Sequence, residues 1–323
     1  MAAPAYRTSR PMRRLLFALG SLLTLAMIGW GSAQALDQLS IQEDHAVERY
    51  AGVREIDLRH AHGDVELVRA RGSRVVVTVD SRRGFLSGHE RSATLDGGTL
   101  RLRGSCDFLT LGTCEEDYRV EVPRGVAVTV RTSAGAATAR GLRGDLDLRS
   151  SAGPVRAVDV RGGEVELRSS AGPVDADDVR ADTLDLRSSA GPVTATEVLA
   201  ATLRLRSSAG PVSAERARAA RVTAHASAGP VDLELLSPPL SVDADSTAGG
   251  VTVRVPDVGY DVEARTSAGE ERVEVRQNPG ARRKVRVDSS AGDVNVLPLE
   301  RTSAPARSPG RDRAPAGRAR SRR

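Results

Sequence analysis

An internal repeat of about 19 residues constrains the fold of this chain more than any other feature. The heptapeptide RSSAGPV occurs four times, and an altered copy, HASAGPV, follows at 225–231. The glycine of each copy can be followed outward into weaker copies on both sides. Such periodicity is the signature of a repeat architecture, in which each copy is one small structural unit. The repeat glycines are Gly135, Gly153, Gly172, Gly191, Gly210, Gly229, Gly249, Gly269 and Gly292.

One copy of the repeat, residues 184–195, reads LDLRSSAGPVTA and has the alternation of a β-strand. Leu186 and the first serine of the copy are predicted to point inward together with Ala190, whereas Asp185 and Arg187 point outward. Gly191 and the following proline predict a turn, because glycine tolerates positive φ and proline offers no amide to a strand ladder. Each unit is therefore expected to consist of short strands and turns, without a helix.

A unit this small buries too little apolar surface to offset the entropy of ordering its chain, so the units must stack. Stacking at ~4.8 Å lets each backbone pair with the coils above and below and aligns equivalent side chains in columns. We therefore predict an all-β fold, a single-stack parallel β-solenoid, with a right-handed turn by the usual crossover preference. The expected inward columns are Leu148, Leu167, Leu186 and Leu205; Ala152, Ala171, Ala190 and Ala209; and Val155, Val174, Val193 and Val212. The expected outward columns are Arg149, Arg168, Arg187 and Arg206, beside Asp147, Glu166 and Asp185, with the acidic column broken at Arg204.

The repeat is blurred before residue 131 and ends near residue 299. The segment 56–65, IDLRHAHGDV, aligns residue for residue with 184–193, so the solenoid is expected to begin there. The predicted organisation is a basic cytoplasmic N-terminus over 1–14, a transmembrane anchor or signal peptide over 15–35, irregular N-terminal coils and a cap with a cysteine loop over 37–130, regular β-solenoid repeats over 131–299, and a disordered basic tail over 300–323.

Residues 15–35 form an uncharged run that is long enough to cross a bilayer as a helix, and four arginines precede it. This pattern favours a retained anchor with an extracytoplasmic C-terminal domain. Ala33 and Ala35 also form an A-x-A pattern, which leaves a cleaved signal peptide and a secreted protein as the alternative. Both interpretations export residues 37 onward.

The two cysteines, Cys106 and Cys114, lie in one short segment, and an exported chain would oxidise them. A disulfide that closes so short a loop contributes roughly 2.5 kcal/mol in the chain-entropy model. A redox switch or half of a metal site are the alternatives, but the segment has neither the C-x-x-C spacing nor a nearby histidine.

The net charge of +5 does not indicate a nucleic-acid partner, because the excess lies at the two ends. Residues 1–14 contribute +4 and residues 301–323 contribute +7, which leaves 5 − 4 − 7 = −6 for residues 15–300. No Phe, Trp or Tyr lies between Arg119 and Gly259, so the repeat array offers no stacking platform for bases or sugars. The basic tail is expected to be solvated or to contact an anionic wall polymer or lipid.

No residue pattern indicates a catalytic or cofactor site. Ser188 and its equivalents have no histidine within their repeats and no G-x-S-x-G elbow. His60, His62 and Asp64 could place two imidazoles on one strand face, but no third or fourth metal ligand is evident. The calcium nonapeptide of β-rolls is absent from the sequence. The acidic group Asp175, Asp177, Asp178 and Asp182 has no accompanying aromatic residue and is expected to be a solvated edge.

The repeated L-x-L-x-S-S-A-G-x-V, quoted above from residues 184–193, resembles the repeat of the bacterial DUF4097 family of proposed adhesins. The resemblance covers roughly residues 53–299. It implies a solenoid of β-strand repeats and an adhesive role, and some members of that family occur beside envelope-stress regulators. It carries over no catalytic or ligand residues.

These observations predict a non-enzymatic, membrane-anchored, extracytoplasmic module for adhesion or envelope interaction. Its expected partners are a cell-envelope or surface macromolecule and, through the N-terminal segment, the membrane. The alternatives are an accessory partner of an envelope-stress sensing system and, less favoured, a carbohydrate-active β-helix enzyme.

Overall fold

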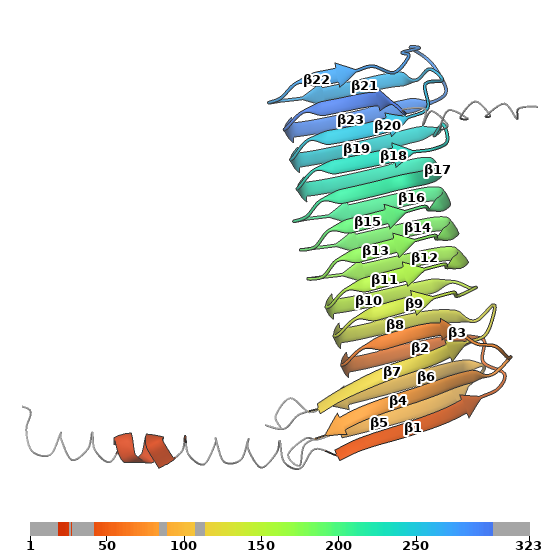
Figure 1. Ribbon diagram of the computed structural model, residues 1–323, viewed down its shortest axis with the longest axis vertical. Coiled ribbons are helices and arrows are strands. Elements are labelled where there is room, and N and C mark those ends of the chain that lie inside the picture. The colour runs from red at the N-terminus through yellow and green to blue at the C-terminus, as the bar shows by residue number, and fades with distance from the viewer. Residues whose placement is uncertain (1–18, 26, 28–41, 84–88, 107–113, 300–323) are drawn as a thin grey trace, which may run out of the picture.

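The repeat folds into a tall stack of β-strands (Figure 1). The computed structural model describes residues 19–25, 27, 42–83, 89–106 and 114–299. These described residues contain 24 strands in one continuous sheet, and residues 19–25 and 27 are helical. The predicted all-β class is confirmed.

The strands form two opposed layers, which we call sheet A and sheet B. Strand β17 joins the two layers, because it turns a corner and pairs with strands in both. In spatial order, sheet A contains β1 (Gln42–Tyr50), β4 (Val75–Arg83), β7 (Cys114–Val122), β3 (Val65–Arg69), β9 (Ala137–Arg140), β11 (Val155–Val158), β13 (Val174–Asp177), β15 (Val193–Thr196), β17 (Val212–Ala228), β18 (Val231–Leu235), β20 (Val251–Val255), β24 (Val294–Pro298) and β22 (Glu271–Val273). Sheet B contains β5 (His89–Asp96), β6 (Thr99–Cys106), β2 (Glu55–His62), β8 (Ala127–Ala134), β10 (Leu146–Ala152), β12 (Arg161–Ser169), β14 (Arg180–Ser188), β16 (Leu199–Ser207), β17, β19 (Ser241–Ala248), β23 (Lys284–Ala291) and β21 (Asp261–Thr266).

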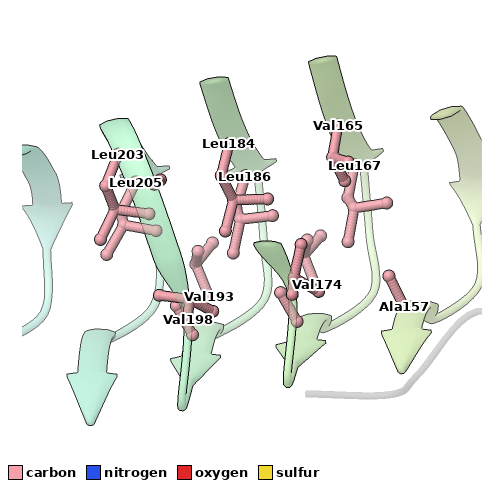
Figure 2. Packing of buried hydrophobic residues seen from close by; sticks show 14 of the residues in the cluster. Ala157, Val165, Leu167, Val174, Leu184, Leu186, Val193, Val198, Leu203 and Leu205 are labelled. Carbon is pink, nitrogen blue, oxygen red and sulfur yellow. The ribbon is translucent and has the colours of Figure 1, made fainter. Parts of the chain in front are cut away.

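Each coil of the regular region contributes one strand to sheet B and the next strand to sheet A. The pairing between neighbouring coils is parallel and keeps equivalent residues opposite each other, so Leu167 faces Leu148 on one side and Leu186 on the other. The leucines of sheet B point toward the valines of sheet A (Figure 2). The resulting core is narrow and continuous. The leucine column Leu148, Leu167, Leu186 and Leu205 and the valine column Val155, Val174, Val193 and Val212 are both buried.

The corner after each sheet B strand differs from the expectation. Ala152, Ala171, Ala190 and Ala209 were expected to point inward, but all four are exposed, and the following glycine is buried instead. Gly191 does not require positive φ, because it is not among the residues with that conformation. It is required because a Cβ there would lie 2.4 Å from the carbonyl oxygen of Gly172 in the preceding coil. Close approach between coils therefore explains this glycine.

The first serine of each RSSAGPV copy fixes the same corner from inside. Ser188 is buried, and its hydroxyl donates to the carbonyl oxygen of Gly172 at 2.9 Å and accepts the amide of Gly191 at 2.9 Å. Ser169 and Ser207 make the corresponding bond to the glycine of the preceding coil. The inward serine is thus a structural part of the stack.

The N-terminal end of the stack does not follow the order of the chain. β2 and β3 form a regular coil that pairs directly with β8 and β9, with Ile56 opposite Val128. The strands between them in sequence, β4 to β7, form the layers beyond this coil. The pairs β1–β4, β4–β7 and β5–β6 are antiparallel, and every other strand pair in the described residues is parallel. The irregular segment is therefore an inserted cap.

The C-terminal end also departs from chain order. β23 and β24 lie between the coil of β19 and β20 and the coil of β21 and β22 (Figure 1). The repeat glycines consequently stack in the order Gly229, Gly249, Gly292, Gly269, and not in the order of their numbers. The two coils also differ in burial. Val285, Val287, Val294 and Val296 are fully buried in the inner coil, whereas Val262, Ala264 and Val273 of the end coil are only partly buried.

Three expectations involve residues outside the described part of the chain. No helix within the described ranges is long and apolar enough to cross a membrane. Most of the expected anchor at 15–35 lies outside those ranges, as does the tail 300–323, so both stay predictions. Cys106 ends β6 and Cys114 begins β7, but the side chain of Cys106 is not described, and the disulfide between them also stays a prediction.

Candidate functional site: an arginine and serine face

Sheet B carries an uninterrupted row of arginines on its outer surface, which we call the arginine column. Each arginine follows a buried leucine or valine, so strand alternation turns it outward. Parallel pairing in register then places one arginine beside the next on seven neighbouring strands. The column is Arg103, Arg59, Arg131, Arg149, Arg168, Arg187 and Arg206 in spatial order.

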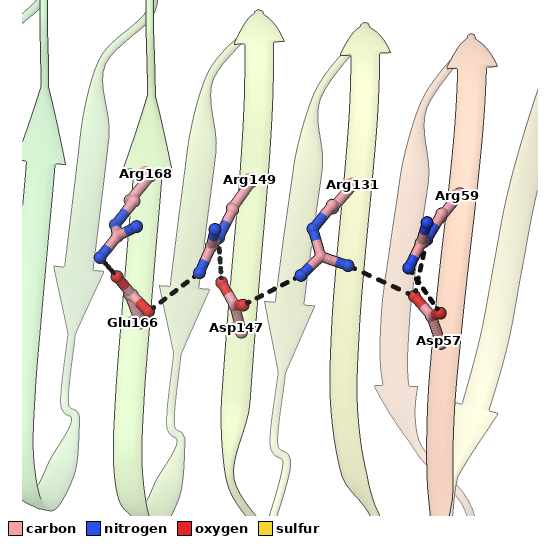
Figure 3. A network of polar contacts seen from close by, with 7 residues as sticks. All are labelled: Asp57, Arg59, Arg131, Asp147, Arg149, Glu166 and Arg168. Atoms are coloured by element: carbon pink, nitrogen blue, oxygen red, sulfur yellow. Dashed lines mark hydrogen bonds and ion pairs between the residues drawn. The ribbon is translucent and has the colours of Figure 1, made fainter. Parts of the chain in front are cut away.

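Acidic side chains two residues earlier in the strands connect neighbouring arginines (Figure 3). Arg149 donates to Asp147 at 2.8 Å on its own strand and lies 3.3 Å from Glu166 on the next. Arg131 lies 3.5 Å from Asp57 and 4.0 Å from Asp147, on either side. These contacts reduce the repulsion that stacked arginines would otherwise impose.

The acids do not neutralise the arginine column. Asp57, Asp147, Glu166 and Asp185 face the five central arginines. Within the described residues, Arg206 has no ion pair, because Arg204 occupies the position that an acid holds in the three preceding coils. Arg103, at the other end of the column, likewise has no ion pair within the described residues. The column therefore carries excess positive charge, most of it near its ends.

The pKa shifts of two arginines in the middle of the column reflect their charged neighbours. Burial lowers the pKa of Arg168, and the neighbouring charges of Arg149 and Arg187 lower it further. The hydrogen bond from Arg187 to Asp185 raises the pKa of Arg187. A bound anion would therefore relieve repulsion at Arg168 in particular.

A second column of exposed hydroxyl groups runs beside the arginines. It consists of the second serine of each copy, which strand alternation places on the same side as the arginine. Together the two columns line an open groove of about 580 Å³. We call this surface the arginine–serine face. Its exposed hydroxyls come from Ser151, Ser170, Ser189 and Ser208.

The groove ends at His225, which takes the arginine position in the next coil. Its Nε2 lies 3.3 Å from the hydroxyl of Ser227, and its Nδ1 contacts Asp245. An acyl-transfer site would also need donors aimed at an oxyanion. The amide of Ala228, which follows the serine, already donates to Ser208 at 3.0 Å. We therefore assign this group no catalytic role.

The other candidate residues identified in the sequence are dispersed. His60 points into the core, His62 is exposed at the corner, and Asp64 accepts the amide of Ala136 at 2.7 Å. Asp175 and Asp177 lie on β13 of sheet A, Asp178 lies at the following corner, and Asp182 lies on β14 of sheet B. Within the described ranges, no group of three or more His, Cys, Asp or Glu side chains could hold a metal ion.

The structure adds a buried polar cluster that the sequence did not indicate. His60 Nδ1 lies 3.8 Å from Glu116 Oε2, and the Tyr118 hydroxyl donates to the same oxygen at 3.2 Å. The rings of His60 and Tyr118 meet edge to face with centroids 4.9 Å apart. Burial lowers the pKa of His60 to about 4 and raises that of Tyr118. β7 begins at Cys114, and its alternation turns both Glu116 and Tyr118 inward.

The fold and its outer columns define a class: an all-β repeat protein whose coils stack in register and display side chains in rows. The chain belongs to the DUF4097 family, because the family model described as Toastrack DUF4097 matches residues 53–297. The family resemblance seen in the repeat is thus confirmed.

Three solved structures illustrate what this chain is similar to. A proposed adhesin from Bacteroides fragilis is 11% identical, with a TM-score of 0.42, and the match covers 80% of this chain and 97% of that one. A proposed lipid-binding protein from Parabacteroides distasonis is 12% identical, with a TM-score of 0.49 and coverage of 79% and 97%. A proposed adhesin from Parabacteroides merdae is 9% identical, with a TM-score of 0.45 and coverage of 79% and 96%. No curated protein matches this chain.

Proposed function

We propose that this protein is a non-enzymatic binding module of the cell envelope, which acts in adhesion or envelope interaction through the arginine–serine face. The observation that carries the proposal is the arginine column, in which seven arginines stand in register on neighbouring strands. The stack itself needs none of these side chains for its core. Exposed charge repeated in register favours a binding role over a purely structural one.

The proposed location is extracytoplasmic, with the N-terminal segment over 15–35 as anchor or signal peptide. The uncharged run preceded by arginines supports this location. The proposed partner is a macromolecule of the envelope or of a surface. The basic tail would add affinity for anionic polymer or lipid.

The test compares attachment of cells that display the protein with arginine-column variants. The double substitution Arg149→Ser and Arg187→Ser is expected to reduce attachment several-fold. Arg156→Ser together with Arg254→Ser removes two arginines from sheet A and is expected to leave attachment unchanged. Equal attachment by all variants would contradict the proposal.

The accessory role in envelope-stress sensing makes a different prediction. Deletion of the protein would then change a cell-wall stress reporter while surface attachment stays the same. The binding module proposed here predicts the opposite pattern, with a flat reporter and reduced attachment.

A further inference from the structure

We propose that the arginine–serine face binds a linear polymer carrying phosphate groups, which lies along the stacking axis and contacts several coils at once. The inference rests on the proposed function, because it names the ligand class of the same face.

The geometry of the column favours an extended ligand. Neighbouring strands are ~4.8 Å apart, so the six intervals between Arg103 and Arg206 span roughly 29 Å. A single phosphate group reaches only one or two of these arginines. A polymer that follows the groove would contact the five arginines that line it, Arg131, Arg149, Arg168, Arg187 and Arg206.

The chemistry of the groove favours phosphate oxygens. Guanidinium groups bind phosphate through paired N–H donors, and hydroxyl groups add further donors. Each copy of the repeat supplies both, with Arg168 beside Ser170 and Arg187 beside Ser189. Asp57, Asp147 and Glu166 are each shared between arginines of neighbouring coils, so they leave guanidinium donors available to a ligand. Arg206, which has no acidic partner among the described residues, offers the strongest single contact.

The shape of the charge argues against a flat bilayer as the ligand. The arginines form one row, and Asp57, Asp147, Glu166 and Asp185 run beside it. A planar lipid surface would press those carboxylates against lipid phosphates. Among the described residues, no exposed large apolar side chain lines the groove. The absence of aromatic residues between Arg119 and Gly259 also removes base stacking.

The experiment measures binding of the full-length chain, purified in neutral detergent, to inorganic polyphosphate. The probes are orthophosphate, tripolyphosphate and long-chain polyphosphate, compared at equal phosphate concentration by calorimetry over a range of salt concentrations. We expect the affinity, expressed per polyphosphate molecule, to be at least tenfold higher for the long polymer than for tripolyphosphate. The double substitution Arg149→Ser and Arg187→Ser should lower affinity for the polymer about tenfold and reduce the salt slope by about 2.

The matched control is the sheet A pair Arg156→Ser and Arg254→Ser, which removes the same charge and keeps the tail. The conservative pair Arg149→Lys and Arg187→Lys should retain part of the affinity, since charge remains but the paired donors are lost. Equal losses in the sheet A and sheet B pairs would overturn the inference. Affinity that does not rise with polymer length would also overturn it.

Two further outcomes separate this inference from the proposed function. In the first outcome, vesicles of anionic phospholipid bind as tightly as the polymer, and the sheet B variant loses affinity for both equally. The ligand would then be a membrane, which would overturn the inference but not the proposed function. Polymer binding that depends on the arginine column, combined with unchanged cell attachment in the same variant, would support the ligand class and overturn the proposed function.

Discussion

At the scale of single residues, Gly191 shows how closely the coils approach. A Cβ at this position would lie 2.4 Å from one backbone oxygen and 2.6 Å from the adjacent carbon of the preceding coil. Backbone atoms held in a ladder cannot move aside as a flexible side chain would. The corner thus selects glycine in every regular coil.

The substitution Gly191→Ala is therefore expected to destabilise the protein by about 2 to 3 kcal/mol through overpacking. Chemical denaturation followed by circular dichroism measures the loss. Gly72→Ala is the control, because nothing lies within 4 Å of a Cβ there. Similar unfolding midpoints for both variants would show that the coils are farther apart than described.

His60 makes stability depend on pH. Burial lowers its pKa from 6.5 to about 4, so the unfolded chain binds a proton between these values that the folded chain does not. The free energy of unfolding should therefore fall as pH decreases from about 6.5 to about 4, by up to about 3 kcal/mol from this group.

The control variant is His60→Thr, since threonine occupies the paired position 132 of the next coil. Denaturation at several pH values should give a shallower slope over this interval for the variant than for the unaltered protein. Parallel slopes for the two proteins would mean that His60 is protonated as easily in the fold as in the unfolded chain.

At the scale of the elements, the end coil is the weakest layer. Among the described residues, β21 and β22 pair with a neighbouring strand on one side only, and the outward side of β21 carries charged residues such as Glu263 and Arg265. Charged residues on an edge strand discourage pairing with another chain. The sequence order would have placed this coil inside the stack. The exchange instead places the coil of β23 and β24, with its four buried valines, inside the stack.

Aspartate substitutions test this arrangement. Val285→Asp buries an unpaired charge in the inner coil and should cost about 4 kcal/mol or more. Val262→Asp, in the end coil, should cost less than half as much because Val262 is already partly exposed. Melting temperatures of the two variants measure the difference. A greater loss of stability for Val262→Asp would indicate that the coils stack in the order of the chain, with β21 and β22 inside.

The sequence predicted those elements whose position depends only on alternation and repeat length. Leu186 and Val193 lie in buried, in-register columns because period two and a constant spacing fix both face and register. Ala190 was placed on the wrong side, because the chain leaves strand geometry at the corner. The exchange of the last two coils was missed because chain order was taken as stacking order, whereas packing decides it.

The candidate site was predictable only in part. The arginines from Arg149 to Arg206 were expected as an outward column, since they belong to the heptapeptide that is repeated within this chain. Arg59, Arg103 and Arg131 were not connected to it. Their place depends on β2 and β6 pairing with strands far away in sequence. Long-range pairing of this kind leaves no local signal in the sequence.

At the scale of the whole molecule, stacking converts a short repeated sequence into long rows of identical side chains. The cap of antiparallel strands closes one end, and the coil of β21 and β22 forms the other (Figure 1). Binding along such a surface grows with the number of coils that a ligand contacts. A polymer ligand therefore suits the molecule better than a small one.

The central claim is that strand pairing, and not chain order, aligns residues in columns, and pairs of introduced cysteines test it directly. Asn295 lies opposite both Thr252 and Arg272, which belong to the coils on either side of it. We predict that Thr252→Cys with Asn295→Cys forms a disulfide on mild oxidation, mapped by mass spectrometry of peptides. Thr252→Cys with Arg272→Cys should not, since those residues are two coils apart, about 9.6 Å. Cross-linking of the second pair without the first would contradict the account.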